Sequence, residues 1–165
     1  MQITLETDYA IRTLLYLSGK TEYCSAREIG EAIALKWEHA QKILRKLHKQ
    51  NLVKATYGRD GGYLLAKEPK DITMLDVMKI MENKHVINRC LEDDRFCSRP
   101  DVTDCRDCPV HRFYDHVQGE LEDVFRNTTI QDFVDCSDDH SLIPGYTDLS
   151  SPDDKKIGSG KTLSE

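Results

Sequence analysis

The chain has 165 residues, of which 39% are hydrophobic, and this length and composition suit one compact domain with appendages. No stretch approaches the roughly 18 apolar residues of a membrane-spanning helix, and the opening residues lack the basic start and apolar run of a signal peptide. We therefore expect a cytoplasmic protein with no membrane association.

The net charge of −6 is divided unevenly along the chain. Residues 1–67 hold 11 lysines and arginines and 7 aspartates and glutamates, a net charge of +4. Residues 68–165 hold 12 and 22, a net charge of −10. Such an asymmetry is more informative than the total charge. The first part is suited to contact phosphate groups, whereas the second is not.

Two short helices are predicted at the start of the chain. We expect Thr7 to cap the first helix and Gly19 to end it, because apolar residues recur between them at helical spacing. Ser25 and Glu28 form a capping-box motif, in which the two side chains satisfy free backbone amides reciprocally. This motif predicts a second helix over residues 26–34.

A third helix is predicted after a turn at residues 35–36, and its two faces differ. Its core face carries Ala40, Ile43, Leu44 and Leu47 at i, i+3, i+4 and i+7 spacing. Its opposite face carries Glu38, Lys42, Arg45 and Lys49. Most faces of this kind are simply solvated. Two short helices in succession, the second with a basic outer face, are however typical of a helix-turn-helix.

A β-hairpin is predicted directly after the third helix. Residues 52–57 alternate like a strand, and residues 63–66 form the return strand. Residues 58–62 between them contain three glycines, which adopt positive φ freely. A hairpin in this position is typical of the wing of a winged-helix domain. We expect Arg59 at its tip to reach a phosphate or the minor groove.

Two further helices are predicted, on either side of an irregular segment. Thr73 is expected to cap a fourth helix, and residues 88–107 then lose their periodicity. A long helix over residues 109–126 follows, with an apolar stripe that spans four turns. The stripe either lies across the chain's own core or pairs with a twofold mate. We favour a dimerisation helix, because helix-turn-helix proteins usually bind DNA as dimers.

These elements predict a mainly α-helical fold with a small β-hairpin, namely a winged helix-turn-helix with a long C-terminal dimerisation helix. The expected organisation is a DNA-binding domain over residues 1–84 and a cysteine-rich cofactor loop over residues 85–108. Residues 109–136 form the dimerisation helix and a terminal segment, in which residues 129–134 add a turn of helix. Residues 137–165 are polar, and we expect them to be disordered.

Four of the six cysteines lie within nineteen residues: Cys90, Cys97, Cys105 and Cys108. In a cytoplasmic protein this cluster indicates metal or redox chemistry rather than disulfides. Thiolates suit both iron–sulfur clusters and zinc, and four of them can close a tetrahedral site. An iron–sulfur cluster, a structural zinc and a thiol–disulfide switch all stay open on these residues alone. Because Cys108 precedes Pro109 at a predicted helix start, the helix favours its thiolate.

Four segments share their pattern with known regulators: LETDYAIRTLLYL, SAREIGEAI…QKILRKLHKQNLV, GRDGGYLLAKEP and DITMLDVMKIME. They resemble the IscR/NsrR (Rrf-type) family of bacterial transcription regulators, over residues 1 to about 135. The resemblance implies a homodimeric winged-helix repressor or activator that binds double-stranded operator DNA. Because cysteines occupy the loop in which several family members hold an iron–sulfur cluster, it also implies a 2Fe–2S or 4Fe–4S cluster. The state of that cluster, altered by oxygen, nitric oxide or iron supply, would set the affinity for DNA.

The resemblance also assigns candidate ligands. Cys108 falls on the family's third cysteine, which makes Cys105 an additional one. His111 lies where the iron–sulfur assembly regulator places a histidine ligand, and Asp8 lies where the nitric-oxide-sensing repressor supplies a carboxylate from the partner chain. The expected metal ligands are therefore Cys90, Cys97, Cys105 and Cys108. Three of them, Cys90, Cys97 and Cys108, match the family's cysteines, and Cys105, Asp8 and His111 are the alternatives for the fourth position. Zinc is the alternative metal.

The expected DNA contacts are Lys36, His39, Gln41, Lys42, Arg45, Lys46 and Arg59. Gln41 occupies the position at which the assembly regulator reads DNA with a glutamate, and Tyr57 stands where the family often has arginine, so the resemblance implies a different operator sequence. The rival hypothesis is a small redox enzyme on a winged-helix scaffold. Against it, the sequence shows no nucleophile–base pair and no phosphate-binding glycine loop, and we expect no enzymatic activity.

Overall fold

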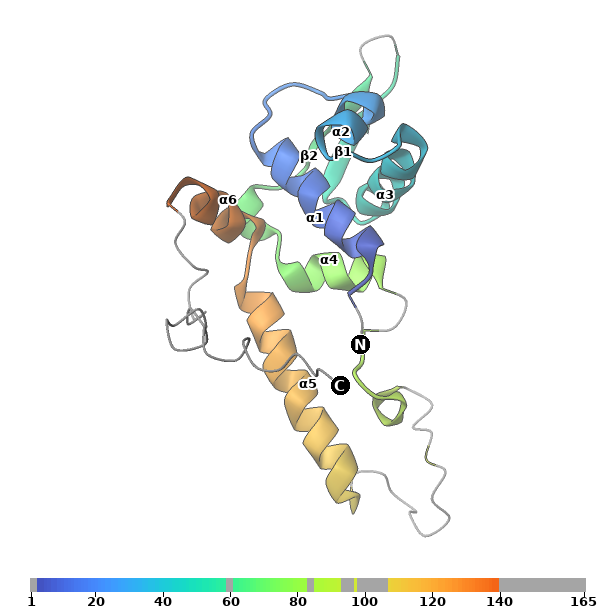
Figure 1. Ribbon diagram of the computed structural model, residues 1–165, viewed down its shortest axis with the longest axis vertical. Helices are drawn as coiled ribbons and strands as arrows, with labels where there is room; N and C mark the ends of the chain where they lie inside the picture. The colour runs from blue at the N-terminus through green and yellow to red at the C-terminus, as the bar shows by residue number, and fades with distance from the viewer. Residues whose placement is uncertain (1–2, 59–60, 83–84, 93–96, 98–106, 140–165) are drawn as a thin grey trace, which may run out of the picture.

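The computed structural model describes residues 3–58, 61–82, 85–92, 97 and 107–139, and it consists of a head and a long projecting helix (Figure 1). The elements in chain order are α1 (Leu5–Ser18), α2 (Ala26–Ala32), α3 (Trp37–Lys49), β1 (Val53–Thr56), β2 (Gly62–Leu65), the 3₁₀ turn η1 (Pro69–Asp71), α4 (Met74–Met81), the 3₁₀ turn η2 (Arg89–Leu91), α5 (Pro109–Asn127) and α6 (Ile130–Asp139). This confirms a mainly helical chain with a small hairpin. None of the helices in the described residues is long and apolar enough to cross a membrane.

The core of the head lies between α1, α3 and the elements that pack against them. Leu14 and Leu17 of α1 and Leu44 and Leu47 of α3 are fully buried. The predicted core face of the third helix is confirmed, since Ala40, Ile43, Leu44 and Leu47 are all at most 1% exposed. Burial of this amphipathic face, rather than helix propensity, provides most of the stability of such short helices.

Two predicted helix ends differ from the structure. Thr7 does not cap α1, because the helix begins at Leu5 and Thr7 is a buried residue inside it. The α2 helix ends at Ala32, before the predicted end, because Ala34 adopts the left-handed conformation with φ of 55°. Half of the predicted capping box of α2 forms, since the Glu28 backbone N–H donates to the Ser25 hydroxyl over 3.1 Å. The Glu28 carboxylate instead accepts a hydrogen bond of 2.8 Å from the Tyr16 hydroxyl of α1.

The hairpin forms as predicted, with β1 and β2 antiparallel and Val53 paired with Leu65. Gly58 begins the turn with φ of +118°, a conformation that side chains other than glycine rarely adopt. The chain before α2 also pairs with β2, through hydrogen bonds between the backbones of Cys24 and Tyr63 of 3.0 and 2.8 Å. Arg59, the predicted wing-tip residue, lies outside the described residues.

The chain after α5 returns to the head. The Met74 N–H donates to the Thr128 carbonyl over 2.8 Å and the Ile130 N–H donates to the Ile72 carbonyl over 2.9 Å, which forms an antiparallel bridge. Ile130 is 0% exposed and belongs to the core of the head. The α6 helix thereby packs against α1 and η1. It also runs to Asp139, and residues 140–165, most of the predicted disordered tail, lie outside the described part of the chain.

The close approach of α2 to the start of α3 generates a stability prediction. A Cβ atom on Gly30 would lie 2.7 Å from the Leu35 carbonyl oxygen and 3.3 Å from the Trp37 Cα. We expect Gly30→Ala to lower the free energy of unfolding by about 1–3 kcal/mol, because both neighbours are backbone atoms. Urea denaturation measures this change. Gly19→Ala is the control, since a Cβ atom on Gly19 would meet nothing within 4 Å, and equal stability of the two variants would contradict the tight turn.

Candidate nucleic-acid interface and metal centre

The solvent face of α3 is cationic. Lys36, at the N-cap position, and His39, Lys42 and Arg45 are exposed, whereas Gln41 and Lys46 are partly buried. The structure thus places six of the seven residues predicted to contact DNA on or directly before one helix. Lys46, His48 and Lys49 also lie in the last turn of α3, where positive charge is favoured by the helix dipole.

One of these cations already has a partner within the head. The Lys46 ammonium lies 2.7 Å from the Glu6 carboxylate of α1, and the two side chains are 42% and 46% exposed. An ion pair this exposed contributes little to stability. Its consequence is positional, because it joins the first turn of α1 to the helix that carries the basic face.

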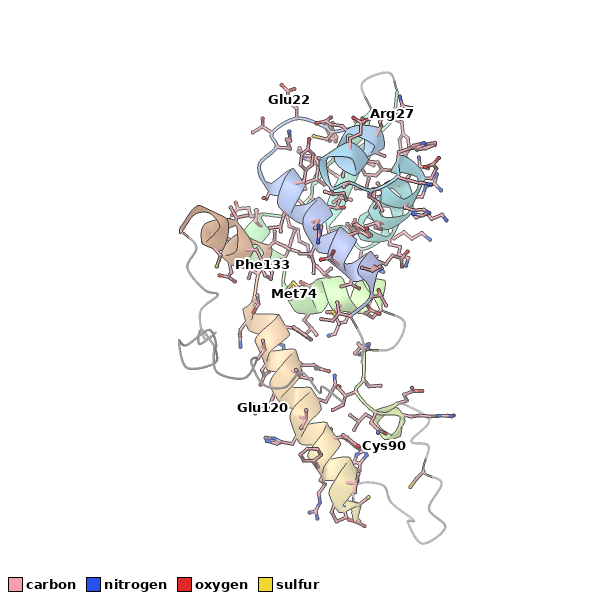
Figure 2. The ribbon with its side chains drawn as sticks, in the orientation of Figure 1. Glu22, Arg27, Met74, Cys90, Glu120 and Phe133 are labelled. Atoms are coloured by element: carbon pink, nitrogen blue, oxygen red, sulfur yellow. The ribbon has the colours of Figure 1, made fainter. Side chains whose placement is uncertain are left out.

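The cysteine loop begins and ends beside the N-terminal half of α5. Cys108 is 9% exposed and occupies the N-cap position of that helix. Cys90 lies on η2, which packs against α5 (Figure 2). Cys97 is exposed, and Cys105 lies outside the described residues. The structure therefore brings the first and last cysteines of the loop to the same end of α5.

His111 has a buried nitrogen that lacks a partner. Its Nδ1 atom makes no hydrogen bond within the described part of the chain. Leaving a buried polar atom unsatisfied costs about 1–3 kcal/mol, so such an atom commonly marks the place of a missing group. His111 lies three residues after Cys108, on the same face of the helix.

The donor types at this end of α5 fit a soft metal or an iron–sulfur cluster, because thiolate and imidazole are the ligands that such centres prefer. Among the described residues, no three histidine, cysteine or carboxylate side chains converge as a metal site. The ligand set of Cys90, Cys97, Cys105 and Cys108 therefore stays a prediction.

Asp8 and Cys108 lie on different parts of the chain. Asp8 is on α1 in the head, whereas Cys108 precedes the first turn of α5, which projects away from the head (Figure 1). Its carboxylate is 2.9 Å from the Arg12 guanidinium, one turn later on the same helix. A ligand role for Asp8 would consequently require a second copy of the chain.

Glu82 links the start of the cysteine loop to the head. It follows α4, and its carboxylate accepts hydrogen bonds from the Thr4 backbone N–H and the Thr4 hydroxyl, both of 2.9 Å, and from the Thr7 hydroxyl. Burial by itself would raise the pKa of Glu82, but these hydrogen bonds outweigh it and hold the pKa below its ordinary value. Sequence analysis missed this contact, because its partners lie more than seventy residues away.

Gln118 fixes the next part of the same segment to α5. This side chain is 8% exposed. It accepts a hydrogen bond from the Ile87 N–H over 3.0 Å and donates to the His85 carbonyl over 3.2 Å and to the Glu122 carboxylate over 2.9 Å. The chain that enters the cysteine loop is therefore attached to both α1 and α5. The sequence indicates this role only weakly, because Gln118 is simply a polar residue beside the apolar stripe of α5.

Comparisons with known proteins agree on one family. The family model Rrf2, described as an iron-dependent transcriptional regulator, matches residues 3–136. A putative HTH-type transcriptional regulator of Aquifex aeolicus is 28% identical over 80% of this chain and 90% of its own length. The HTH-type transcriptional regulator NsrR of Shouchella clausii is 35% identical over 54% of this chain and 62% of its own length, and NsrR of Bacillus licheniformis is 25% identical over 85% and 96%.

Solved structures show the same fold. T. potens IscR aligns with a TM-score of 0.65 and 21% identity, covering 88% of this chain and 95% of that one. CymR, the global cysteine regulator of B. subtilis, aligns with a TM-score of 0.64 and 20% identity, covering 82% and 97%. These likenesses confirm the predicted winged helix-turn-helix with a long C-terminal helix.

The environment of Glu82 generates a pH-dependent prediction. Because its folded-state pKa is lowered, the ionised carboxylate stabilises the fold above the unfolded pKa of about 4.3, and this contribution is lost as the pH falls through the folded pKa. We expect Glu82→Gln to be less stable than the wild type by on the order of 1 kcal/mol at pH 7. The difference should shrink progressively below about pH 4.3.

Chemical denaturation at pH 7, 5, 4 and 3 measures the effect of Glu82→Gln. Glu31→Gln, at an exposed position of α2, is the matched control, and we expect it to change stability at pH 7 by less than about 0.5 kcal/mol. A Glu82→Gln effect that stays constant over the whole pH range would contradict the assigned role of the charge.

Proposed function

The chain belongs to the Rrf2 family of transcriptional regulators, and we propose that an iron–sulfur cluster in the loop between α4 and α5 sets its affinity for operator DNA. Its relatives are transcriptional regulators and not enzymes. The observation that carries the proposal is the buried, unpartnered Nδ1 atom of His111 beside the buried Cys108, at the end of α5 remote from the basic helix. We place the protein in the cytoplasm, where thiols stay reduced.

The DNA contacts of this proposal come from α3 and the wing. Lys36, Lys42 and Arg45 present three exposed cations on and just before one helix, in the part of the chain with a net charge of +4. Basic residues neutralise phosphates and position the protein, whereas contacts to base edges select the sequence. His39 and Gln41 on α3 are suited to the second role, and Lys46 and Arg59 complete the proposed contact set.

The cofactor ligands of the proposal are Cys90, Cys97, Cys105 and Cys108, with His111 or Asp8 of a second copy as a further ligand. When bound, an iron–sulfur cluster supplies a redox-active centre whose potential depends on its ligands and solvent exposure. This chain contributes the N-terminus of α5, whose dipole favours the thiolate form of Cys108. The burial of Cys108 limits its contact with water.

Gain or loss of the cluster in the loop would be transmitted to the DNA-binding head by contacts of Glu82 and of residues 85–87. Glu82 is bonded to the first turn of α1, and Gln118 holds residues 85–87 on α5. The same first turn of α1 is joined to α3 by the pair between Glu6 and Lys46. Such a contiguous set of contacts can favour one of two positions of α3 over the other.

We also propose a homodimer through α5. Val110, Phe113 and Val124 lie along one face of this helix and are 55%, 61% and 59% exposed. Its opposite face is polar, so the apolar residues form a stripe rather than a scatter. A twofold dimer would cover the stripe and place two α3 helices on DNA half-sites about 34–36 Å apart.

Purification without oxygen tests the cofactor. We expect the wild type to be coloured and to contain iron and acid-labile sulfide, and we expect Cys108→Ala to lose both. Cys136→Ala is the matched control, because this cysteine lies on α6 outside the loop. If the purified protein is instead colourless and holds one zinc ion, the cluster proposal is wrong and the loop holds a structural zinc. The assignment of the fold would not change.

Titration onto DNA with and without the cluster tests the regulation. We expect the two forms to differ in operator affinity by at least about fivefold, the lower end of typical coupling between sites. Glu82→Gln should reduce this ratio without removing the cluster. Equal affinity of the two forms would rule out sensing by the cluster, and a difference that depends only on thiol oxidation would indicate a thiol switch.

The dimer is tested by Phe113→Glu and Val124→Glu. Each places a charge in the apolar stripe, so we expect a monomer by light scattering and a loss of operator affinity. Arg112→Glu, at an exposed position away from the stripe, is expected to stay dimeric. A wild-type protein that is monomeric at micromolar concentration would contradict the proposal.

A further inference from the structure

The only tryptophan of the chain is exposed at the start of the helix that carries the basic face. Trp37 is the first residue of α3 and is 45% exposed. The core of this helix is already filled by the buried residues Ala40, Ile43, Leu44 and Leu47. Trp37 therefore presents a large flat apolar surface to solvent, although burying such a side chain would be favourable.

The backbone at the start of α3 packs closely against α2. The Leu35 N–H donates to the Gly30 carbonyl over 2.8 Å, and Gly30 leaves no room for a Cβ atom against Leu35 and Trp37. Helical side chains lean towards the N-terminus of their helix, so a side chain at the first position extends past the helix end. In helix-turn-helix proteins, residues at this end of the recognition helix contact base edges.

The neighbours of Trp37 suit DNA better than an apolar protein surface. Lys36 precedes it, and Lys42 and Arg45 are exposed on the same helix. Gln41 lies four residues later, on the same flank of α3. Within the major groove, the apolar group that distinguishes one base from the others is the methyl group of thymine.

We propose that Trp37 is a specificity-determining residue that packs its indole ring against a thymine methyl group in each operator half-site, beside the base pair that Gln41 contacts. The inference rests on the proposed binding of α3 to operator DNA. It goes further by specifying a thymine at one position of each operator half-site. Lys36 and Lys42 bind phosphates in this arrangement and hold the indole at the floor of the groove.

Operator sequences are first selected from random duplex DNA with the wild-type dimer. Each thymine of the selected site is then replaced in turn by deoxyuridine, which removes only the methyl group. At one position in each half-site we expect wild-type binding to weaken by about fourfold, the effect of one buried methyl group. Trp37→Ala should bind the thymine and deoxyuridine duplexes equally at that position.

Matched variants separate this reading role from general effects. Tyr23→Ala removes an aromatic side chain that is 42% exposed but lies outside α3, and it should keep the response to deoxyuridine. Lys42→Ala should weaken binding to all sequences to a similar extent and should also keep that response. Trp37→Phe, which retains an apolar ring, should keep part of it. Thermal unfolding of each variant verifies that the head is folded.

Fluorescence provides an independent readout, because the chain's tryptophan emission comes from Trp37 alone. We expect the selected operator to shield it from acrylamide quenching more strongly than random duplex does at equal occupancy. Two results would overturn the inference: quenching that does not change on operator binding, or the absence of a thymine position at which the wild type and Trp37→Ala differ. Neither result would contradict the proposed binding of operator DNA. A wild-type protein that selects no sequence would overturn the proposed DNA reading as well.

Discussion

The arrangement of the whole chain depends on the antiparallel crossing at Thr73 and Thr129. Backbone hydrogen bonds join the two segments there, and Ile130 enters the core of the head directly afterwards. Thr73 and Thr129 also cap the helices that follow, because each exchanges hydrogen bonds with the aspartate three residues later. Because α5 ends at this crossing, its last turn is attached to the head and its first turn projects away from it (Figure 1).

This geometry separates the basic face of α3 from Cys108 at the start of α5. A helix of 19 residues is about 28 Å long, so the thiols at its first turn cannot touch the basic face of α3 in the same chain. The connection between them runs through side chains: Glu82 to the first turn of α1, Gln118 to the segment before Cys90, and Glu6 to Lys46. The apolar stripe of α5 is exposed for the same reason, since the head covers only the C-terminal end of the helix.

Local patterns predicted the elements well. The side-chain caps Ser25 and Thr73 begin helices where expected, and the apolar spacing in α3 identifies its buried face. The errors occur where a contact or turn outside the helix overrides a local preference. Thr7 resembles a helix cap by residue type, yet the acceptor of its hydroxyl is Glu82 and the helix extends past it to Leu5. Ala34 fits a continued helix, yet the turn into α3 places it in the left-handed region.

The sequence by itself determined the winged helix-turn-helix, the basic face of α3, the long amphipathic α5 and the spacing of the cysteines, because each depends on residues within a few turns of one another. Only the tertiary structure decided that Ile130 completes the head and that Gln118 holds residues 85–87. It also decided that Glu82 binds α1 and that the Nδ1 atom of His111 is buried. These contacts join residues that are far apart in the chain or depend on what the folded backbone covers, and no local periodicity encodes either.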